Sequence, residues 1–136
     1  MGLNPRILLD THAAVHWLLS PKQLSKEQLR ILREVVRQRQ TVGVSAITLL
    51  EIAALFGSGS RRGHVPAAYI LREIDVHDAI QVVPLSVEIA TEIAAMGGAL
   101  PDPADRAIVA TAKVHRLRLI TSDQRIIESN LVPVVS

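Results

Sequence analysis

The amino-acid sequence predicts an α/β fold with a parallel, doubly wound sheet covered by helices on both faces. Segments of strand and helix character alternate along all 136 residues, which is the order that builds a parallel sheet. The strand-like segments are short and almost entirely apolar, as expected for strands buried on both sides. Because no repeat, linker or low-complexity tract divides the chain, we expect one domain over residues 1–136.

The first half of the chain begins with an apolar run that predicts a buried strand at residues 6–10. It passes directly into a helix over 11–19, which a Ser-Pro pair ends. Ser25 and Gln28 have the spacing of a capping box and predict a helix that runs to about residue 39. The next expected elements are a strand at 42–45 and a helix at about 46–56.

In the second half, the glycine- and serine-rich stretch 57–63 is the clearest loop. Asp102 followed by Pro103 predicts the start of a helix, and Pro133 in the last strand indicates a sheet edge. The expected order is helix 66–76, strand 81–84, helix 86–96, helix 103–115, strand 118–121, a helical turn at 124–129 and strand 132–135.

Composition excludes several classes of protein. Cysteine is absent, which rules out disulfides, thiolate metal sites and cysteine nucleophiles. No apolar run reaches the roughly 18 residues of a membrane span, and the chain does not start like a signal peptide. We therefore expect a cytoplasmic protein with no membrane partner.

Four acidic residues stand where predicted strands end or helices begin: Asp10, Glu51, Asp105 and Asp123. In an open α/β sheet, sites assemble in the crevice outside the carboxyl ends of the strands. Four carboxylates gathered there repel one another unless a cation lies between them, and oxygen ligands suit Mg²⁺ or Mn²⁺. The pattern predicts a metal-dependent phosphoryl-transfer enzyme and, within that class, a nuclease.

The charge pattern fits this prediction without deciding it. Net charge is +2, and if the four acids form one pocket, the rest of the chain is clearly basic, as phosphate steering requires. A solvated surface with a mild basic excess explains the same numbers. Aromatic residues make up only 2% of the chain, so stacking on aromatic platforms is not expected as the main binding mode.

Each acid also has a structural explanation. Asp10 and Asp123 can cap helices, and Asp105 suits the positive end of a helix dipole. Thr48 and Glu51 have capping-box spacing. The four together favour the functional explanation, because Glu51 lies in a nearly unbroken apolar stretch, where an ionised side chain is costly without a partner or a metal.

Four motifs surround these acids in order: 8–12 with Asp10, 44–52 with Glu51, 102–106 with Asp105, and 119–123 with Asp123. With these motifs the chain resembles, over essentially its whole length, the PIN-domain ribonucleases, in particular the VapC-like toxins of bacterial type II toxin–antitoxin modules. The resemblance implies a PIN-like three-layer α/β/α sandwich with a mostly parallel central sheet.

In that family Asp10, Glu51 and Asp105 match the three core acids, and Asp123 matches a fourth, more variable one. The resemblance implies that they bind one or two Mg²⁺ or Mn²⁺ ions and act as the catalytic residues of RNA cleavage by an activated water. It also implies a cognate antitoxin protein as a partner, and a homodimer. Asp102 matches an acid found in part of the family, and we interpret it first as a helix cap and second as an auxiliary group.

Several other polar residues are candidates for smaller roles. The hydroxyls of Thr11, Ser45 and Thr121 lie beside the acids in sequence and either orient water and carboxylates or serve as cap and turn residues. Arg61 and Arg62, in the predicted loop, are candidate RNA contacts, with a solvated surface as the equal alternative.

The remaining basic and histidine residues favour ordinary surface roles. His12 and His16 have the spacing to share a metal on one helix face, but no third nitrogen ligand is evident, so we interpret them as packing or surface residues. Arg30, Arg33 and Arg37 form a stripe that is typical of a solvated helix face.

Two alternative functions remain open. A phosphoacceptor receiver domain needs two adjacent acids after its first strand, whereas Asp10 follows three apolar residues alone. A catalytically silent PIN-like module that binds RNA or protein is the stronger alternative, although all four acids are present.

Overall fold

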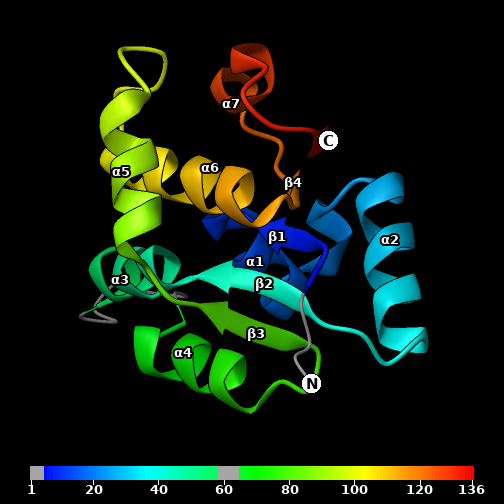
Figure 1. Ribbon diagram of the computed structural model, residues 1–136. Helices are drawn as coiled ribbons and strands as arrows, with labels where there is room; N and C mark the ends of the chain where they lie inside the picture. Colours follow the sequence, from blue (N-terminus) through cyan, green and yellow to red (C-terminus); the bar gives the residue numbers. More distant parts are fainter. Residues whose placement is uncertain (1–4, 58–64) are drawn as a thin grey trace.

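The computed structural model describes residues 5–57 and 65–136 and is built on one parallel sheet (Figure 1). Its five strands lie in the order β3-β2-β1-β4-β5, and every neighbouring pair is parallel. The strands are β1 (Ile7–Leu9), β2 (Val42–Ser45), β3 (Ile80–Val83), β4 (Arg118–Ile120) and β5 (Val134–Val135). The prediction of a mostly parallel central sheet is confirmed.

Helices connect the strands as the alternating sequence pattern predicts. A single 3₁₀ turn, η1 (Pro21–Gln23), follows the first helix. The α-helices are α1 (Thr11–Leu19), α2 (Lys26–Arg37), α3 (Ala46–Phe56), α4 (Ala67–Val76), α5 (Val87–Ala95), α6 (Pro103–His115) and α7 (Gln124–Ser129). No helix in the described ranges is long and apolar enough to cross a membrane.

The side-chain alternation of β1 defines the two faces of the sheet. Ile7 and Leu9 are buried with α1 and α2 on one face, whereas Leu8 points the other way, into a cluster with residues of α6 and α7. Figure 1 shows α5, α6 and α7 together on that second side. The result is the three-layer α/β/α sandwich implied by the family resemblance.

A smaller apolar cluster attaches α3 and α4 to the rest of the molecule. Ile52 of α3 and Ile70 of α4 are fully buried in it, and side chains from α1 pack against it. This cluster fixes the direction of α3, the helix that carries Glu51.

The position of β1 in the sheet determines where a site forms. The chain goes from β1 to β2 and β3 on one side and returns later to β4 on the other. This reversal of strand order is a topological switch point, where connections leave on opposite faces and open a crevice at the carboxyl ends of the strands. Asp10 follows β1 directly at that point.

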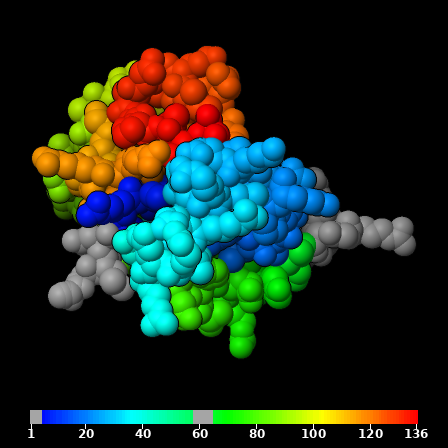
Figure 2. Space-filling view, turned by 90° about the vertical axis from the view of Figure 1, so that its right-hand side faces the viewer, coloured from blue at the N-terminus to red at the C-terminus, as the bar shows by residue number. Residues whose placement is uncertain are grey.

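Gln28 ties α2 to the carboxyl edge of β5 and is fully buried. Its Oε1 accepts from the Ser25 N–H at 3.0 Å, and its Nε2 donates to the Val135 carbonyl at 3.0 Å. The predicted capping box is therefore present. Its Gln28 also anchors α2 to the distant C-terminal strand β5. Figure 2 shows this side of the molecule, where α2 lies beside the C-terminal segment.

Most predicted element boundaries are confirmed to within two residues. The strand predicted at 132–135 is shorter, because Pro133 precedes the two paired residues, and it does lie at the sheet edge. The predicted loop lies outside the described residues apart from Gly57. The capping-box spacing of Thr48 and Glu51, the structural alternative for Glu51, does not correspond to a cap, because Ser45 caps α3 and Thr48 lies inside the helix.

We predict that Gln28→Ala lowers the free energy of unfolding by about 2–4 kcal/mol, because it leaves a cavity and removes the buried hydrogen bonds of Gln28 to Val135 and Ser122. Urea denaturation of both proteins measures the difference. Gln40→Ala, which changes an exposed side chain, is the matched control and should change stability by less than about 0.5 kcal/mol. Equal effects of the two substitutions would contradict the anchoring role of Gln28.

Candidate active site

Asp10 is held rigidly at the end of β1. It is buried, its Oδ1 accepts from the Ala13 N–H at 2.7 Å, and its Oδ2 accepts a short hydrogen bond from the Thr121 hydroxyl. Thr121 Oγ1 in turn accepts from the Asp123 N–H at 3.0 Å. The cap of α1 and the turn after β4 are thus joined through one carboxylate.

Glu51 reaches the same region from α3. Its Oε1 accepts a short hydrogen bond from the Thr11 hydroxyl, and Thr11 also lies 3.0 Å from the hydroxyl of Thr48. Thr11 and Thr48 are both buried. These contacts explain how an acid tolerates its apolar helix, and they join α3 to the start of α1 beside Asp10.

Asp102 and Asp105 occupy the N-terminus of α6. Asp102 is exposed and accepts from the N–H groups of Ala104 and Asp105 at 2.8 and 3.0 Å, which confirms its predicted capping role. Asp105 lies one turn further on, and its side chain is only 17% exposed. Its position at the positive end of the helix dipole favours an ionised carboxylate.

Asp123 follows β4 and is bridged to Asp105 by a guanidinium. Arg125 Nη2 lies 3.4 Å from Asp123 Oδ2 and 3.6 Å from Asp105 Oδ2. Asp123 also caps α7, since its Oδ1 accepts from the Arg125 N–H at 2.9 Å. One cationic side chain therefore lies between two of the four acids.

The pKa values show that the acids interact. Burial, followed by the negative charges of Asp102, Asp123 and Glu51, raises the pKa of Asp105 from 3.8 to about 6. Burial raises the pKa of Asp10 even though Thr121 and the Ala13 N–H stabilise its charged form.

The opposite holds for Asp123. Its partial burial would raise the pKa, but the hydrogen bonds and charge of Arg125 outweigh that effect and hold the pKa below its ordinary value. Strongly perturbed acids of opposite direction in one crevice are typical of functional sites.

The donor set fits a hard divalent cation in its chemistry. All four groups are carboxylates, the ligands that Mg²⁺ and Mn²⁺ prefer, and the bridging guanidinium of Arg125 marks where positive charge is favourable. Within residues 5–57 and 65–136, no three His, Asp or Glu side chains already converge as a closed ligand set. The acids therefore do not form a ready ligand set, and Arg125 occupies the space between Asp105 and Asp123.

The other candidate residues have different positions. Ser45 is buried, and its Oγ accepts from the Ile47 N–H at 3.1 Å as the cap of α3. Arg61 and Arg62 lie outside the described residues. In the arginine stripe, Arg30 and Arg37 are exposed and paired with Glu27 and Glu34 on the same helix, in agreement with the solvated face predicted for it.

Sequence reasoning missed Arg125 and the second role of Gln28. Arg125 stands two residues after Asp123, a proximity visible in the sequence, but its contact with Asp105 is not. Gln28 Nε2 also lies 3.3 Å from the Ser122 hydroxyl, next to Asp123, whereas its capping-box spacing indicated only a local role.

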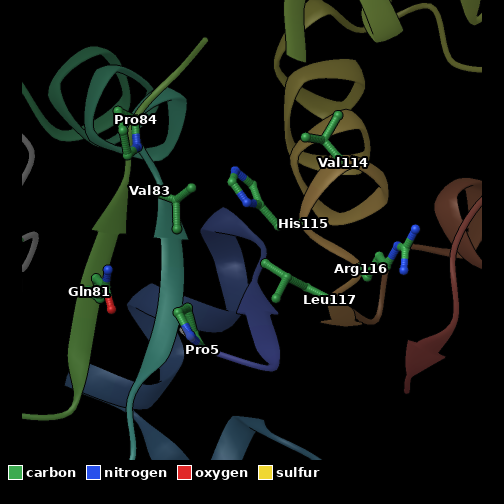
Figure 3. A pocket seen from close by; sticks show the side chains of 8 residues that line it. All are labelled: Pro5, Gln81, Val83, Pro84, Val114, His115, Arg116 and Leu117. Carbon is green, nitrogen blue, oxygen red and sulfur yellow. The ribbon is translucent and has the colours of Figure 1, made fainter. Parts of the chain in front are cut away.

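Two hollows lie at different ends of the molecule. The first, which we call the α1 pocket, has a volume of about 270 Å³, lies between α1, η1 and the turn after β4, and includes Asp10 and Asp123. The second has a volume of about 400 Å³ and lies where α6 ends; His115 and Val83 line it. Figure 3 shows His115 between β2 and α6 there, at the opposite end of α6 from Asp105.

Comparison with known proteins gives concordant matches. The model of the PIN domain family matches residues 7–129. Ribonuclease VapC22 of Mycobacterium tuberculosis is 31% identical to this chain over 121 residues, which are 88% of each protein.

Solved structures show the same fold at low sequence identity. The VapBC2 structure from Rickettsia felis, bound to a promoter DNA fragment, contains a chain that matches with a TM-score of 0.70 at 12% identity, over 95% of this chain and 97% of that one. A chain of a toxin–antitoxin complex from Klebsiella pneumoniae matches with a TM-score of 0.64 at 20% identity, over 96% of both chains.

We predict that Asp105→Asn stabilises the metal-free protein at pH 8. The pKa of Asp105 is raised in the folded state, so its protonated form favours folding below about pH 4 and this contribution is lost as pH rises through about 6. Removing the charge should raise the free energy of unfolding by about 1–2 kcal/mol at pH 8 and leave it nearly unchanged at pH 4.

Urea denaturation in EDTA at both pH values measures this effect. Asp75→Asn, on the exposed face of α4, is the matched control and should leave the pH dependence unaltered. A difference between Asp105→Asn and the natural chain that is equal at pH 4 and pH 8 would exclude the repulsion described above.

We predict that Arg125→Ala raises the pKa values of both Asp105 and Asp123, because its positive charge lowers each of them. Carboxyl ¹³C chemical shifts followed against pH in metal-free buffer measure both values. Arg33→Ala, an exposed arginine on α2, is the control. An unchanged pKa of Asp105 in Arg125→Ala would show that the guanidinium does not bridge the two acids in solution.

Proposed function

We propose that this chain, which belongs to the PIN-domain family, is a divalent-metal-dependent endoribonuclease and the toxin of a type II toxin–antitoxin module. The observation that carries the proposal is the gathering of Asp10, Glu51, Asp105 and Asp123 around the switch point of the sheet. The similarity to a ribonuclease over most of both chains supports it.

The four acids are the proposed catalytic and metal-binding residues. Asp10 lies at the centre, between the acids that follow β2 and β4, and Asp123 interacts electrostatically with both Asp10 and Asp105. A bound Mg²⁺ or Mn²⁺ ion, or a pair of them, supplies positive charge for the scissile phosphate and a more acidic water. The four acids determine where that charge is placed.

The neighbouring hydroxyls have positioning roles in this proposal. Thr121 fixes one oxygen of Asp10, and Thr11 fixes one oxygen of Glu51, so each carboxylate presents its charge in a defined direction. Asp102 and Ser45 act further out, by capping the helices that carry Asp105 and Glu51.

In the proposed reaction, water attacks the phosphorus in line with the leaving oxygen. The new bond joins the water oxygen to phosphorus, the bond from phosphorus to the ribose 3′-oxygen breaks, and the products carry a 5′-phosphate and a 3′-hydroxyl. The attacking water gives up one proton to the solvent, and the departing 3′-oxygen takes one up to become the hydroxyl. Arg125, which contacts both Asp105 and Asp123, is the proposed cationic contact for the phosphate.

The proposed partners are an RNA substrate, a cognate antitoxin protein and a second copy of this chain, all in the cytoplasm. Support for the antitoxin comes from the solved relatives, one of which is a toxin–antitoxin complex. Leu50 and Leu55 on α3 are more than half exposed and are the proposed apolar contacts with a partner chain.

A catalytically silent RNA- or protein-binding module remains the alternative. Such a module has no need to hold four carboxylates near one another, among them Asp105, whose pKa is raised by burial and by neighbouring negative charges. Their retention around one crevice favours the enzyme.

We predict that the purified chain cleaves total RNA with Mg²⁺ or Mn²⁺ and not with EDTA, and that Asp10→Asn lowers the rate by at least about 100-fold because it removes the central charge. Gel analysis of the RNA measures cleavage. Asp75→Asn, far from the crevice in sequence and exposed on α4, should cleave normally.

The outcome that contradicts the enzyme is specific. If the folded, antitoxin-free chain binds Mn²⁺ and RNA but cleaves none, the silent module is correct. If Asp10→Asn cleaves as fast as the natural chain, the catalytic role of Asp10 is wrong. RNA binding by Asp10→Asn, measured by fluorescence anisotropy, separates loss of chemistry from loss of fold.

A further inference from the structure

We propose that the α1 pocket binds the nucleobase of the nucleotide next to the scissile phosphate. The pocket has a volume of about 270 Å³, enough for one base with part of its ribose. One end is formed by Asp10 and Asp123, the two acids that flank the β1–β4 edge. The identification of the phosphate rests on the proposed function, whereas the pocket and its lining do not depend on it.

The floor and the walls of the pocket differ in chemistry. Ala13 and Leu24 provide an apolar floor, since both are buried core residues. His12 and His16 lie above it on one face of α1, one helical turn apart, with ring centroids 6.5 Å apart and planes tilted by 50°. Unpaired nucleobases commonly stack on aromatic rings beside an apolar surface such as this floor.

In this proposal the stacking rings are histidines, since the chain has few other aromatic side chains. Phe, Tyr and Trp make up only 2% of the residues, and none of them lines the α1 pocket. Imidazole rings are among the side chains on which unpaired RNA bases stack. His12 and His16 thus supply, beside the acids, the stacking surface that the composition otherwise lacks.

The polar rim can distinguish one base from another. Gln23, at the end of η1, is exposed and lines the pocket, and its amide offers both a donor and an acceptor to a base edge. Ser122 lines it from the other side, where its hydroxyl is held by the buried Gln28. An exposed amide and a hydroxyl held by Gln28, both lining the same pocket, are suited to recognising a base by hydrogen bonds.

The geometry also explains why the two histidines are not a metal site. Within the described parts of the chain, no third His, Asp or Glu converges on them as a ligand. A neutral, planar ligand fits the surroundings of the rings better than a cation does.

The test is a titration of the full chain with adenosine, guanosine, cytidine and uridine, with ribose as the probe that lacks a base. Nucleosides carry no phosphate, so they need neither metal nor catalysis. The ring Hε1 signals of His12 and His16 should shift with at least one nucleoside at up to about 10 mM, as expected for the weak binding of a single base, and should not shift with ribose.

His115 is the internal control, because it lines the other pocket, at the far end of α6. Shifts at His115 without shifts at His12 and His16 overturn the proposal, and so do equal shifts with ribose or none with any nucleoside. Gln23→Ala should reduce the differences in affinity among the four nucleosides without abolishing binding. If it leaves those differences intact, the reading role assigned to Gln23 is wrong.

RNA cleavage provides the second readout. His16→Ala should lower kcat/KM for RNA about tenfold, a typical effect of losing one stacked base, whereas His115→Ala should cleave normally. Nucleoside binding without RNA cleavage by the natural chain would contradict the proposed ribonuclease activity and support base binding in the α1 pocket. If His16→Ala cleaves RNA normally and the natural chain binds no nucleoside, base binding in the α1 pocket is wrong and the ribonuclease activity stands.

Discussion

Mutual repulsion among carboxylates at the carboxyl edge of the sheet is the constraint on which the rest of this structure depends. Three kinds of contact around the four acids reduce the free-energy cost of this repulsion. Helix N-termini face Asp10, Asp105 and Asp123, where the helix dipole favours negative charge. Thr11 and Thr121 donate to two of the carboxylates, and Arg125 bridges two others. Burial, together with the remaining repulsion, raises the pKa of Asp105.

Capping and metal binding are compatible uses of the same acids. Asp10 caps α1 with one oxygen and accepts from Thr121 with the other, and Asp123 caps α7 with Oδ1 while Oδ2 faces Arg125. A carboxylate that is fixed by a backbone N–H keeps its position when the ionic partner changes. The structural explanation of each acid therefore supports its functional explanation, since a preorganised ligand loses less entropy on binding.

The sequence was sufficient for features that depend on local chain. Strand runs, the Ser25 cap and the Asp102-Pro103 start of α6 are set by residues within one turn of each other. Contacts between distant segments could not be predicted from the sequence. Gln28 bonds to Val135, 107 positions away, and Thr11 reaches Glu51 across 40 positions. The capping-box spacing of Glu51 was misleading for this reason, because its hydrogen-bond partner, Thr11, is on another helix.

The turn after β4 links the chemistry of the acids to the neighbouring pocket. Thr121 bonds Asp10, Ser122 is held by Gln28, and Asp123 faces Arg125, so three consecutive residues connect the centre of the site, the core and the charged rim. A ligand that contacts Ser122 in the α1 pocket therefore contacts the same short segment that orients Asp10 and Asp123. Because that segment is anchored on both sides, a base bound in the α1 pocket has a fixed position relative to the acids, which is what alignment of a phosphate for in-line attack requires.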